Sequence, residues 1–235
     1  MKTIPKHMNI LEMIYCCTKE IPNCMVFEYC SSGTLKYHLL TCKNETENVV
    51  EDSILRNLYS FALQIAKGMS YLEDIECVHR TLSSKNVLVD QDNICKITEL
   101  GLSSKVMTES TFESVTEGRL PIRWMALESI LDCIYTSKTD VWSYGVVLWE
   151  IFTLGETPYS GITIRDIIKQ LQQGYRLSKP DYSDEKMFGI IQQCWLGEAA
   201  DRPTFHQLGS FIELGYFQNK NHEKIYEDVP DEDVI

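Results

Sequence analysis

The fold of this chain is decided by the stretch His79-Arg80-Thr81-Leu82-Ser83-Ser84-Lys85-Asn86 together with Glu99-Leu100-Gly101. Two short apolar segments lie between these cassettes, Val87–Val89 and Cys95–Thr98. They predict a small strand pair joined by a turn at Asp90–Asn93. The polar residues before and after this strand pair carry most of the functional information in the sequence.

Length and composition indicate a globular protein with a substantial core. The 235 residues fit one large domain or two small ones, and 44% of them are hydrophobic. The net charge of −12 argues against nucleic acid as a partner, and no basic stripe offsets it. From Glu223 to the end, the acidic residues are balanced by a single lysine. This excess of acid predicts a disordered acidic tail.

The nine cysteines are irregularly spaced. A metal cluster is one reading of Cys16, Cys17, Cys24 and Cys30, but no C-x-x-C pair or matching histidine spacing supports it. We therefore interpret the cysteines as free thiols in a reducing compartment.

No signal peptide and no membrane segment is evident in the sequence. Met1–Ile10 lacks an apolar core, and the most apolar stretch, Val141–Leu154, is too short to span a bilayer and contains Glu150. The chain as written is therefore expected to be cytoplasmic. If it is part of a receptor, we expect it at the cytoplasmic face of the plasma membrane.

Apolar spacing predicts a short β-rich start followed by a mostly helical body, which places the chain in the α+β class. The strands are expected at Met8–Tyr15 and Asn23–Tyr29. The clearest helix has one apolar face, formed by Leu55, Leu58, Ala62, Ile65, Met69 and Leu72. The other expected segments are a helix at Thr34–Leu40, loops at Thr41–Asp52 and from Gly101 to Pro121, and helices at Ser137–Thr153, Thr163–Gln173, Asp184–Trp195 and Thr204–Leu214.

Several motifs, in their order and spacing, resemble a protein kinase domain of the receptor tyrosine kinase branch. They are Val26–Cys30, His79-Arg80, Asn86–Val89, Pro121–Glu128, Asp140–Gly145 and Asp201–Thr204. The branch rests on Pro121–Glu128, because tyrosine kinases have a similar P-[IV]-[KR]-W-M-A-x-E pattern. Only the acidic tail and the Thr41–Asp52 loop lie outside the resemblance.

The resemblance implies a protein kinase-like fold with a mainly helical C-terminal lobe and a truncated β remnant of the N-terminal lobe. Residues 1–30 would be that remnant and the hinge, 31–217 the C-terminal lobe, and 218–235 the tail. The family's Gly-rich loop and strand lysine have no counterpart in this sequence. We expect that the chain is truncated or incomplete, or that the missing strands are supplied from elsewhere.

The catalytic positions depart from the family pattern. The resemblance places Thr81 where the catalytic aspartate would stand and Glu99 where the magnesium aspartate would stand. A hydroxyl has no useful basicity near neutral pH, and losing such a base costs on the order of 10²–10⁴ in rate. Glu99 is one methylene longer than aspartate, so magnesium binding should be weakened. The second magnesium residue, Asn86, is retained, and Lys85 replaces an arginine without its planar fork.

The resemblance also implies a site for the adenine of ATP. Phe27 falls at the gatekeeper position, Glu28, Tyr29 and Cys30 form the hinge, and Leu88 contributes to the pocket. Phe27 is alternatively a strand core residue. ATP and magnesium are the family's cofactors, but without a Gly-rich roof we expect their binding by this chain to be weak or absent.

The remaining positions that match the family pattern are expected to be structural. The resemblance implies that Asp140 hydrogen-bonds the backbone of the catalytic loop around His79, and that Glu128 and Arg202 form a buried ion pair. In active relatives the arginine at the position of Arg80 binds a phosphate on the activation loop. Because Ser103–Arg119 contains no tyrosine, we interpret Arg80 as making a structural bond within its own loop.

The leading hypothesis is a receptor tyrosine kinase-like pseudokinase that acts as a scaffold or modulator of an active kinase. The alternative is an active protein tyrosine kinase whose N-terminal part is missing, and a decayed copy without function is a third reading. Tyr226, in the acidic tail, is a candidate for phosphorylation and capture by a phosphotyrosine-binding module, with an inert tail as its alternative.

Overall fold

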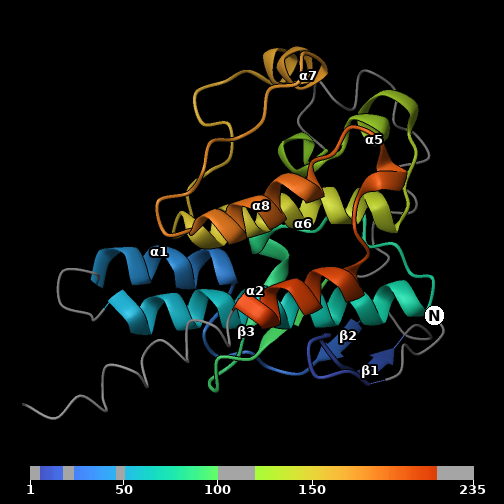
Figure 1. Cartoon of the computed structure of the whole chain (residues 1–235). Coiled ribbons are helices and arrows are strands. Elements are labelled where there is room, and N and C mark those ends of the chain that lie inside the picture. The colour runs from blue at the N-terminus through green and yellow to red at the C-terminus, as the bar shows by residue number, and fades with distance from the viewer. Residues whose placement is uncertain (1–5, 18–23, 46–50, 100–119, 216–235) are drawn as a thin grey trace, which may run out of the picture.

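A helical body with two small antiparallel strand pairs is seen in the computed structural model (Figure 1), which describes residues 6–17, 24–45, 51–99 and 120–215. The predicted α+β class with a mainly helical body is confirmed. In chain order the elements are β1 (Met13–Cys17), β2 (Cys24–Phe27), α1 (Leu35–Glu45), α2 (Glu51–Asp74), the 3-10 turn η2 (Ser84–Asn86), β3 (Val87–Val89), β4 (Cys95–Ile97), η3 (Ile122–Trp124), α5 (Leu127–Asp132), α6 (Ser137–Phe152), α7 (Ile164–Gln172), α8 (Glu185–Cys194), η4 (Ala199–Asp201) and a final helix over residues 205–215.

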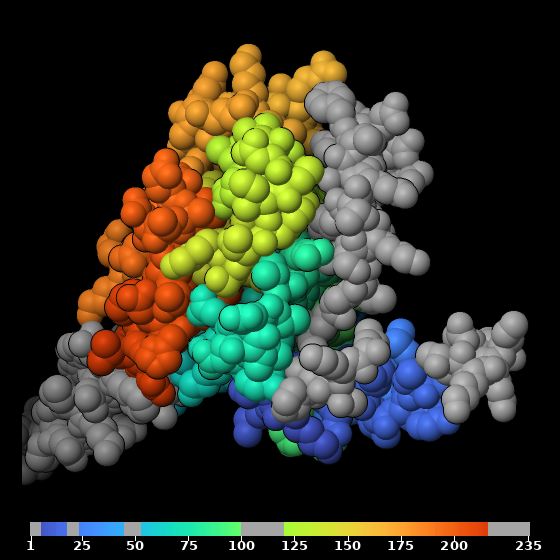
Figure 2. Space-filling model, turned by 90° about the vertical axis from the view of Figure 1, so that its right-hand side faces the viewer, coloured from blue at the N-terminus to red at the C-terminus, as the bar shows by residue number. Residues whose placement is uncertain are grey.

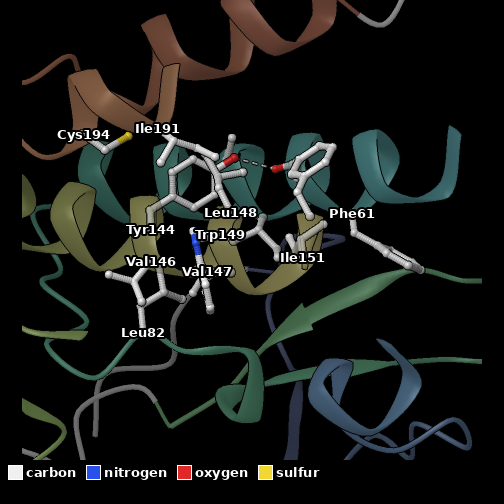
Figure 3. Packing of buried hydrophobic residues seen from close by; sticks show 14 of the residues in the cluster. Phe61, Leu82, Tyr144, Val146, Val147, Leu148, Trp149, Ile151, Ile191 and Cys194 are labelled. Carbon is white, nitrogen blue, oxygen red and sulfur yellow. Dashed lines mark hydrogen bonds between the residues drawn. The ribbon is translucent and has the colours of Figure 1, made fainter. Parts of the chain in front are cut away.

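Helix α6 forms the centre of the core. Every residue from Thr139 to Phe152 is buried, as expected for a helix that is apolar on all sides. Figure 3 shows its side chains gathered with Phe61 of α2 and with Ile191 and Cys194 of α8. A capping box at Thr136 and Thr139 starts the helix at the predicted residue.

Helix α2 presents its predicted apolar face to this core. Leu58, Ala62, Ile65, Met69 and Leu72 are all buried, whereas Leu55 is only half-buried. In Figure 1, α1 runs beside α2, below α6 and α8. The predicted helices at Ser137–Thr153, Thr163–Gln173, Asp184–Trp195 and Thr204–Leu214 are confirmed to within one residue at each end.

The loop predicted at Thr41–Asp52 is wrong at both ends. Helix α1 continues to Glu45, and α2 already begins at Glu51. Tertiary contacts stabilise the extra turn of α1, because Lys43 pairs with Glu156 at 2.8 Å. Residues 46–50 lie outside the described part of the chain, as do residues 101–119 of the loop predicted from Gly101 to Pro121 and the predicted acidic tail.

The strand pair β3–β4 forms as predicted, with Val87 opposite Ile97 and Val89 opposite Cys95. The strand predicted at Met8–Tyr15 is wrong at its start, since Met8 and Asn9 form a turn and β1 begins at Met13. Asn9 causes this difference: its side chain donates to the carbonyl of Cys95 at 3.1 Å, and its carbonyl accepts from the backbone N–H of Ile97.

The strand pair β1–β2 is exposed on both faces. The side chains of Ile14, Tyr15, Met25 and Val26 are 45–63% exposed. Figure 2 shows the N-terminal segments, coloured blue, at the lower edge of the molecule. A two-stranded sheet of this kind is marginal in water unless its apolar faces are covered.

Among the described residues, no helix is both long and apolar enough to cross a bilayer. Within the same residues, no group of three His, Cys, Asp or Glu side chains is arranged to hold a metal ion.

Candidate functional site

Asp140 fixes the backbone of the polar stretch that precedes β3. It is buried in the first turn of α6, where its carboxylate accepts from the backbone N–H of His79 at 2.7 Å and of Arg80 at 2.8 Å. Burial raises the pKa of Asp140 to about 7, while these two donors pull it in the opposite direction. One carboxylate thus joins the core helix to the stretch that carries the candidate chemistry.

The ring of His79 joins the same stretch to the end of β4. Its Nε2 lies 2.8 Å from the carbonyl oxygen of Thr98, and its Nδ1 accepts from the backbone N–H of Thr81 at 3.3 Å. A ring that donates through one nitrogen and accepts through the other is neutral imidazole. Burial lowers the pKa of His79 to about 4, so this bridge is uncharged at neutral pH.

Thr81 stands at the position predicted for a general base. Its Oγ1 lies 3.5 Å from Nδ1 of His79, and its carbonyl accepts from Nδ2 of Asn86 at 2.8 Å. The carbonyl therefore orients Asn86, and the hydroxyl offers no group that takes up a proton near neutral pH.

Asn86 and Glu99 supply oxygen atoms to one cavity of about 480 Å³. Since Nδ2 of Asn86 is bonded to Thr81, its Oδ1 remains as an acceptor. Glu99 is exposed and adopts a left-handed backbone with φ 66°. An amide oxygen and a carboxylate fit magnesium, which is bound through one or two carboxylates together with substrate phosphates. The structure therefore brings the two predicted magnesium residues to the same place.

The wall of this cavity opposite the polar residues comes from the segment after residue 119. It is formed by Leu120, Pro121, Ile122, Arg123 and Trp124, with Ile164 at the start of α7. Arg123 holds the segment in position by donating to the carbonyls of Pro158 and Ile162 at 2.9 and 3.2 Å. An apolar wall beside carboxylate and amide oxygens is able to receive an aromatic or apolar side chain next to a charged group.

Arg80 lies beside an aromatic ring. Its guanidinium carbon is 5.6 Å from the centroid of Tyr135, which is within range for a cation–π contact. Its Nε is buried and has no hydrogen-bond partner among the described residues. The segment Ser103–Arg119, to which a phosphate-binding role would refer, lies outside those residues.

Glu150 holds the polar stretch in place from inside the core, and sequence reasoning did not single it out. Its buried carboxylate accepts from the backbone N–H and hydroxyl of Ser84 at 3.0 and 2.7 Å, and from Nε1 of Trp124 at 2.9 Å. Lys36 of α1 adds an ion pair at 3.7 Å. Its signal in the sequence is one acid in the otherwise apolar stretch Val141–Leu154.

The lysine of η2 lies at the edge of this cluster. Lys85 is exposed, so it differs from the buried Ser84 before it. Burial lowers the pKa of Lys36; the Glu150 carboxylate opposes that shift and the charge of Lys85 adds to it. Lys85 thus contributes positive charge next to Asn86 and has no fixed partner among the described residues.

The residues predicted to contact adenine lie at the end of β2, directly after it, and on β3. Phe27 is 42% exposed and Tyr29 is 87% exposed, so the reading of Phe27 as a core residue is wrong. Cys30 is buried, which raises its pKa, and Leu88 is half-buried. The backbone N–H of Glu28 donates to the carbonyl of Glu12 and is used by the strand pair.

The carboxylate of Glu28 fastens the exposed strand pair to the helical body. It accepts from the backbone N–H of Glu12 at 2.8 Å and pairs with Lys96 of β4 at 3.1 Å. Both ends of this ion pair are largely buried, with 13% of Lys96 and 28% of Glu28 exposed. A shift of β1–β2 therefore disturbs the strand that leads to Glu99.

Glu128 and Arg202 form an ion pair away from the cavity. Arg202 is fully buried, stacks on Trp142 with its guanidinium carbon 5.0 Å from the ring centroid, and donates to three backbone carbonyls besides Glu128. The pair joins the start of α5 to the last part of the chain. Tyr226 lies outside the described residues.

Comparison with known proteins identifies the family. A sequence profile described as protein tyrosine and serine/threonine kinase matches residues 1–212. Among similar proteins, fibroblast growth factor receptor 1 of Xenopus laevis is 41% identical over 218 residues, covering 88% of this chain. The tyrosine kinase receptor Cad96Ca of Drosophila melanogaster is 36% identical over 244 residues, covering 96%. Fibroblast growth factor receptor 1 of Pleurodeles waltl is 37% identical over 231 residues, covering 95%.

These relatives are much longer than this chain. The matched region spans 27–31% of their length. The comparisons therefore concern the part of each receptor that resembles this domain.

Proposed function

Because this chain belongs to the protein tyrosine and serine/threonine kinase family and is a receptor tyrosine kinase-like domain, we propose that it is a pseudokinase that works by binding. Its role would be that of a scaffold or modulator of an active tyrosine kinase. The observation that carries the proposal is Thr81, whose hydroxyl lies beside a neutral histidine and whose carbonyl holds Asn86.

The missing base has a defined kinetic consequence. Removing a positioned general base lowers a rate by on the order of 10²–10⁴. The described contacts of Thr81 supply no substitute, because its neighbour His79 is neutral and both ring nitrogens are engaged, one by the carbonyl of Thr98 and the other by the backbone N–H of Thr81. A binding role needs none of this chemistry and is supported by the intact packing of α6 and its neighbours.

Kinases of this family use ATP and magnesium. In this chain Asn86 and Glu99 would hold the metal, which neutralises charge on the phosphates when it is bound. Glu99 has the longer side chain, and magnesium demands near-ideal octahedral geometry, so we propose weak binding. Thr81 orients the amide of Asn86, and the exposed side chains of Phe27 and Tyr29 offer an apolar surface to a base.

The partners we propose are proteins. An active tyrosine kinase is the first, and a phosphotyrosine-binding module that recognises phosphorylated Tyr226 is the second. We place the domain on the cytoplasmic side of the membrane, where the kinase that it modulates would also work.

The test is a pair of assays on the purified chain. We expect no magnesium- and ATP-dependent phosphorylation of a tyrosine peptide, and a changed rate when the chain is added to an active receptor tyrosine kinase domain. Phosphorylation by the chain alone that is lost in the Asn86→Ala variant would overturn the proposal. The Ser210→Ala variant, changed at an exposed position of the last helix, serves as the matched control.

A second function, an active protein tyrosine kinase with impaired chemistry, is favoured by one observation. Asn86 and Glu99 line the same cavity, and positioning with charge neutralisation supplies much of the rate in this family. On this reading the Thr81→Asp/Glu99→Asp variant gains phosphoryl transfer sharply over a low but measurable starting rate. A starting rate of zero favours the pseudokinase.

A further inference from the structure

Cys17 and Cys24 lie directly opposite each other in the β1–β2 strand pair. The register pairs Cys17 with Cys24, Cys16 with Met25 and Tyr15 with Val26. Residues directly opposite in an antiparallel pair have Cα atoms roughly 4.5–5.5 Å apart and side chains on one face. A disulfide bridges Cα atoms about 4.4–6.8 Å apart, so the strands already hold these two cysteines at bridging distance.

The same geometry excludes the neighbouring cysteines as partners. Cys16 precedes Cys17 in the strand, so its side chain lies on the other face, opposite Met25. Cys30 follows the end of β2 and is buried, with a raised pKa caused by burial. Of the four cysteines in this part of the chain, only Cys17 and Cys24 are paired across the strands.

Both thiols are accessible to a reagent. Cys24 is exposed, and Cys17 is partly exposed at the end of β1. Thiol–disulfide exchange requires that a thiolate reach the disulfide sulfur it attacks. Cys95 and Cys194 are fully buried in the core, and burial raises the pKa of each, so they do not compete.

We propose that Cys17 and Cys24 are a redox modification site that forms a reversible disulfide within one chain, with glutathione disulfide as the oxidant. The thiolate of Cys24 attacks a sulfur of glutathione disulfide, which breaks its S–S bond and releases one glutathione. The thiolate of Cys17 then attacks the mixed disulfide at the Cys24 sulfur and releases the second glutathione. Two thiols are oxidised, one disulfide is reduced, and the two protons end on the glutathione thiols.

The disulfide acts on a part of the fold that is weakly held. Two strands alone are marginal in water, and the faces of β1–β2 are exposed. A disulfide between Cys17 and Cys24 closes one end of the strand pair and so fixes its register. That register positions Phe27 and Glu28 at the opposite end. Oxidation therefore stabilises the attachment of this strand pair to β4, which runs through the ion pair of Glu28 and Lys96. This inference is independent of whether the domain transfers phosphate.

Peptide mapping tests the proposal directly. The reduced chain is equilibrated with glutathione disulfide, its remaining thiols are alkylated, and the denatured protein is digested with trypsin without reduction. Cleavage after Lys6, Lys19 and Lys36 places Cys17 in peptide 7–19 and Cys24 in peptide 20–36. We expect these two peptides to appear as one linked species from monomeric protein, and to separate after reduction.

Four single variants assign the link. It should be lost in Cys17→Ser and in Cys24→Ser, and retained in Cys16→Ser and in Cys30→Ser, which serve as matched controls because each lies in the same two peptides. A linked species that persists in Cys17→Ser, that occurs only in dimers, or that never forms in the unchanged chain would overturn the proposal. Because the readout is a covalent mass, it holds for every variant whether or not its stability changes.

Discussion

Arg202 and Glu128, 74 positions apart, form a two-point ion pair, with Nη1 to Oε1 at 2.6 Å and Nη2 to Oε2 at 3.1 Å. Arg202 is fully buried, and Glu128 is 18% exposed. The guanidinium and the carboxylate have matching planar geometry, so the pair fixes the position of α5 relative to the end of the chain.

Removing Glu128 should destabilise the domain severely. The Glu128→Ala variant leaves the Arg202 charge buried without its counter-ion, which costs about 3–5 kcal/mol. Urea unfolding of the two proteins measures this difference. The Glu156→Ala variant is the control, because the pair of Lys43 and Glu156 is about half exposed and should contribute less than about 1 kcal/mol. Equal losses in the two variants would contradict the buried geometry.

Removing the hydroxyl of Ser84 should loosen the polar stretch before β3. Its Oγ donates to the buried carboxylate of Glu150 at 2.7 Å, and hydrogen bonds to charged groups are worth about 1.5–3 kcal/mol. We expect Ser84→Ala to lower the free energy of unfolding by that amount. The exposed Ser210 donates to the carbonyl of His206 in its own helix, so Ser210→Ala should change stability by less than about 0.5 kcal/mol.

The pH dependence of stability should change when Asp140 is replaced. The pKa of Asp140 is raised to about 7 in the folded chain. Between its unfolded value near 4 and this folded value, the folded state binds more protons, so the Asp140 contribution to stability decreases as pH rises, by up to about 1.4 kcal/mol per pH unit. Loss of this contribution in Asp140→Asn should make the slope of unfolding free energy against pH more positive between pH 5 and 6.5.

His79 opposes Asp140 in the same interval. Burial lowers its pKa to about 4, so the unfolded state binds more protons and the His79 contribution to stability increases as pH rises from about 4 to 6.5. The comparison is therefore made between slopes of the two proteins, measured by urea unfolding at a series of pH values. Parallel slopes would show that the Asp140 pKa is close to its unfolded value.

Breaking the ion pair of Lys96 and Glu28 should release the exposed strands before it affects the helical body. In Lys96→Met the Glu28 carboxylate loses its cation, while the methionine at position 96 keeps an unbranched apolar side chain of similar length. We expect faster amide hydrogen exchange at Glu12, whose N–H donates to Glu28, with unchanged exchange in α6. Uniform acceleration across both regions would show that the strand pair does not open separately.

The sequence was sufficient for elements whose stabilising residues lie close together along the chain. Helix α6 has its cap at Thr136, its capping box at Thr139 and a continuous apolar run, and it begins at the predicted residue. The stretch from His79 to Asn86 is likewise contiguous, so its candidate residues were found together. Helix α1 was predicted too short because the ion pair of Lys43 and Glu156 joins residues 113 positions apart.

The part of the site that the sequence did not reveal depends on packing between distant segments. Glu150 has three partners, Ser84, Trp124 and Lys36, and they lie in three different elements. In the sequence it is a single acid in an apolar helix, which has no local pattern. The turn at Asn9 was missed for the same reason, since its partners are on β4 and α2.

The uncovered strands β1 and β2 have a practical consequence for handling the protein. A short sheet whose edges are unpaired within the described residues, with apolar side chains on both faces, is a template onto which strands from other molecules add. Self-association should therefore begin at this end of the molecule and increase with protein concentration. A single lysine substituted on β2, for example at Met25, should keep the purified domain dispersed at concentrations where the unchanged chain precipitates.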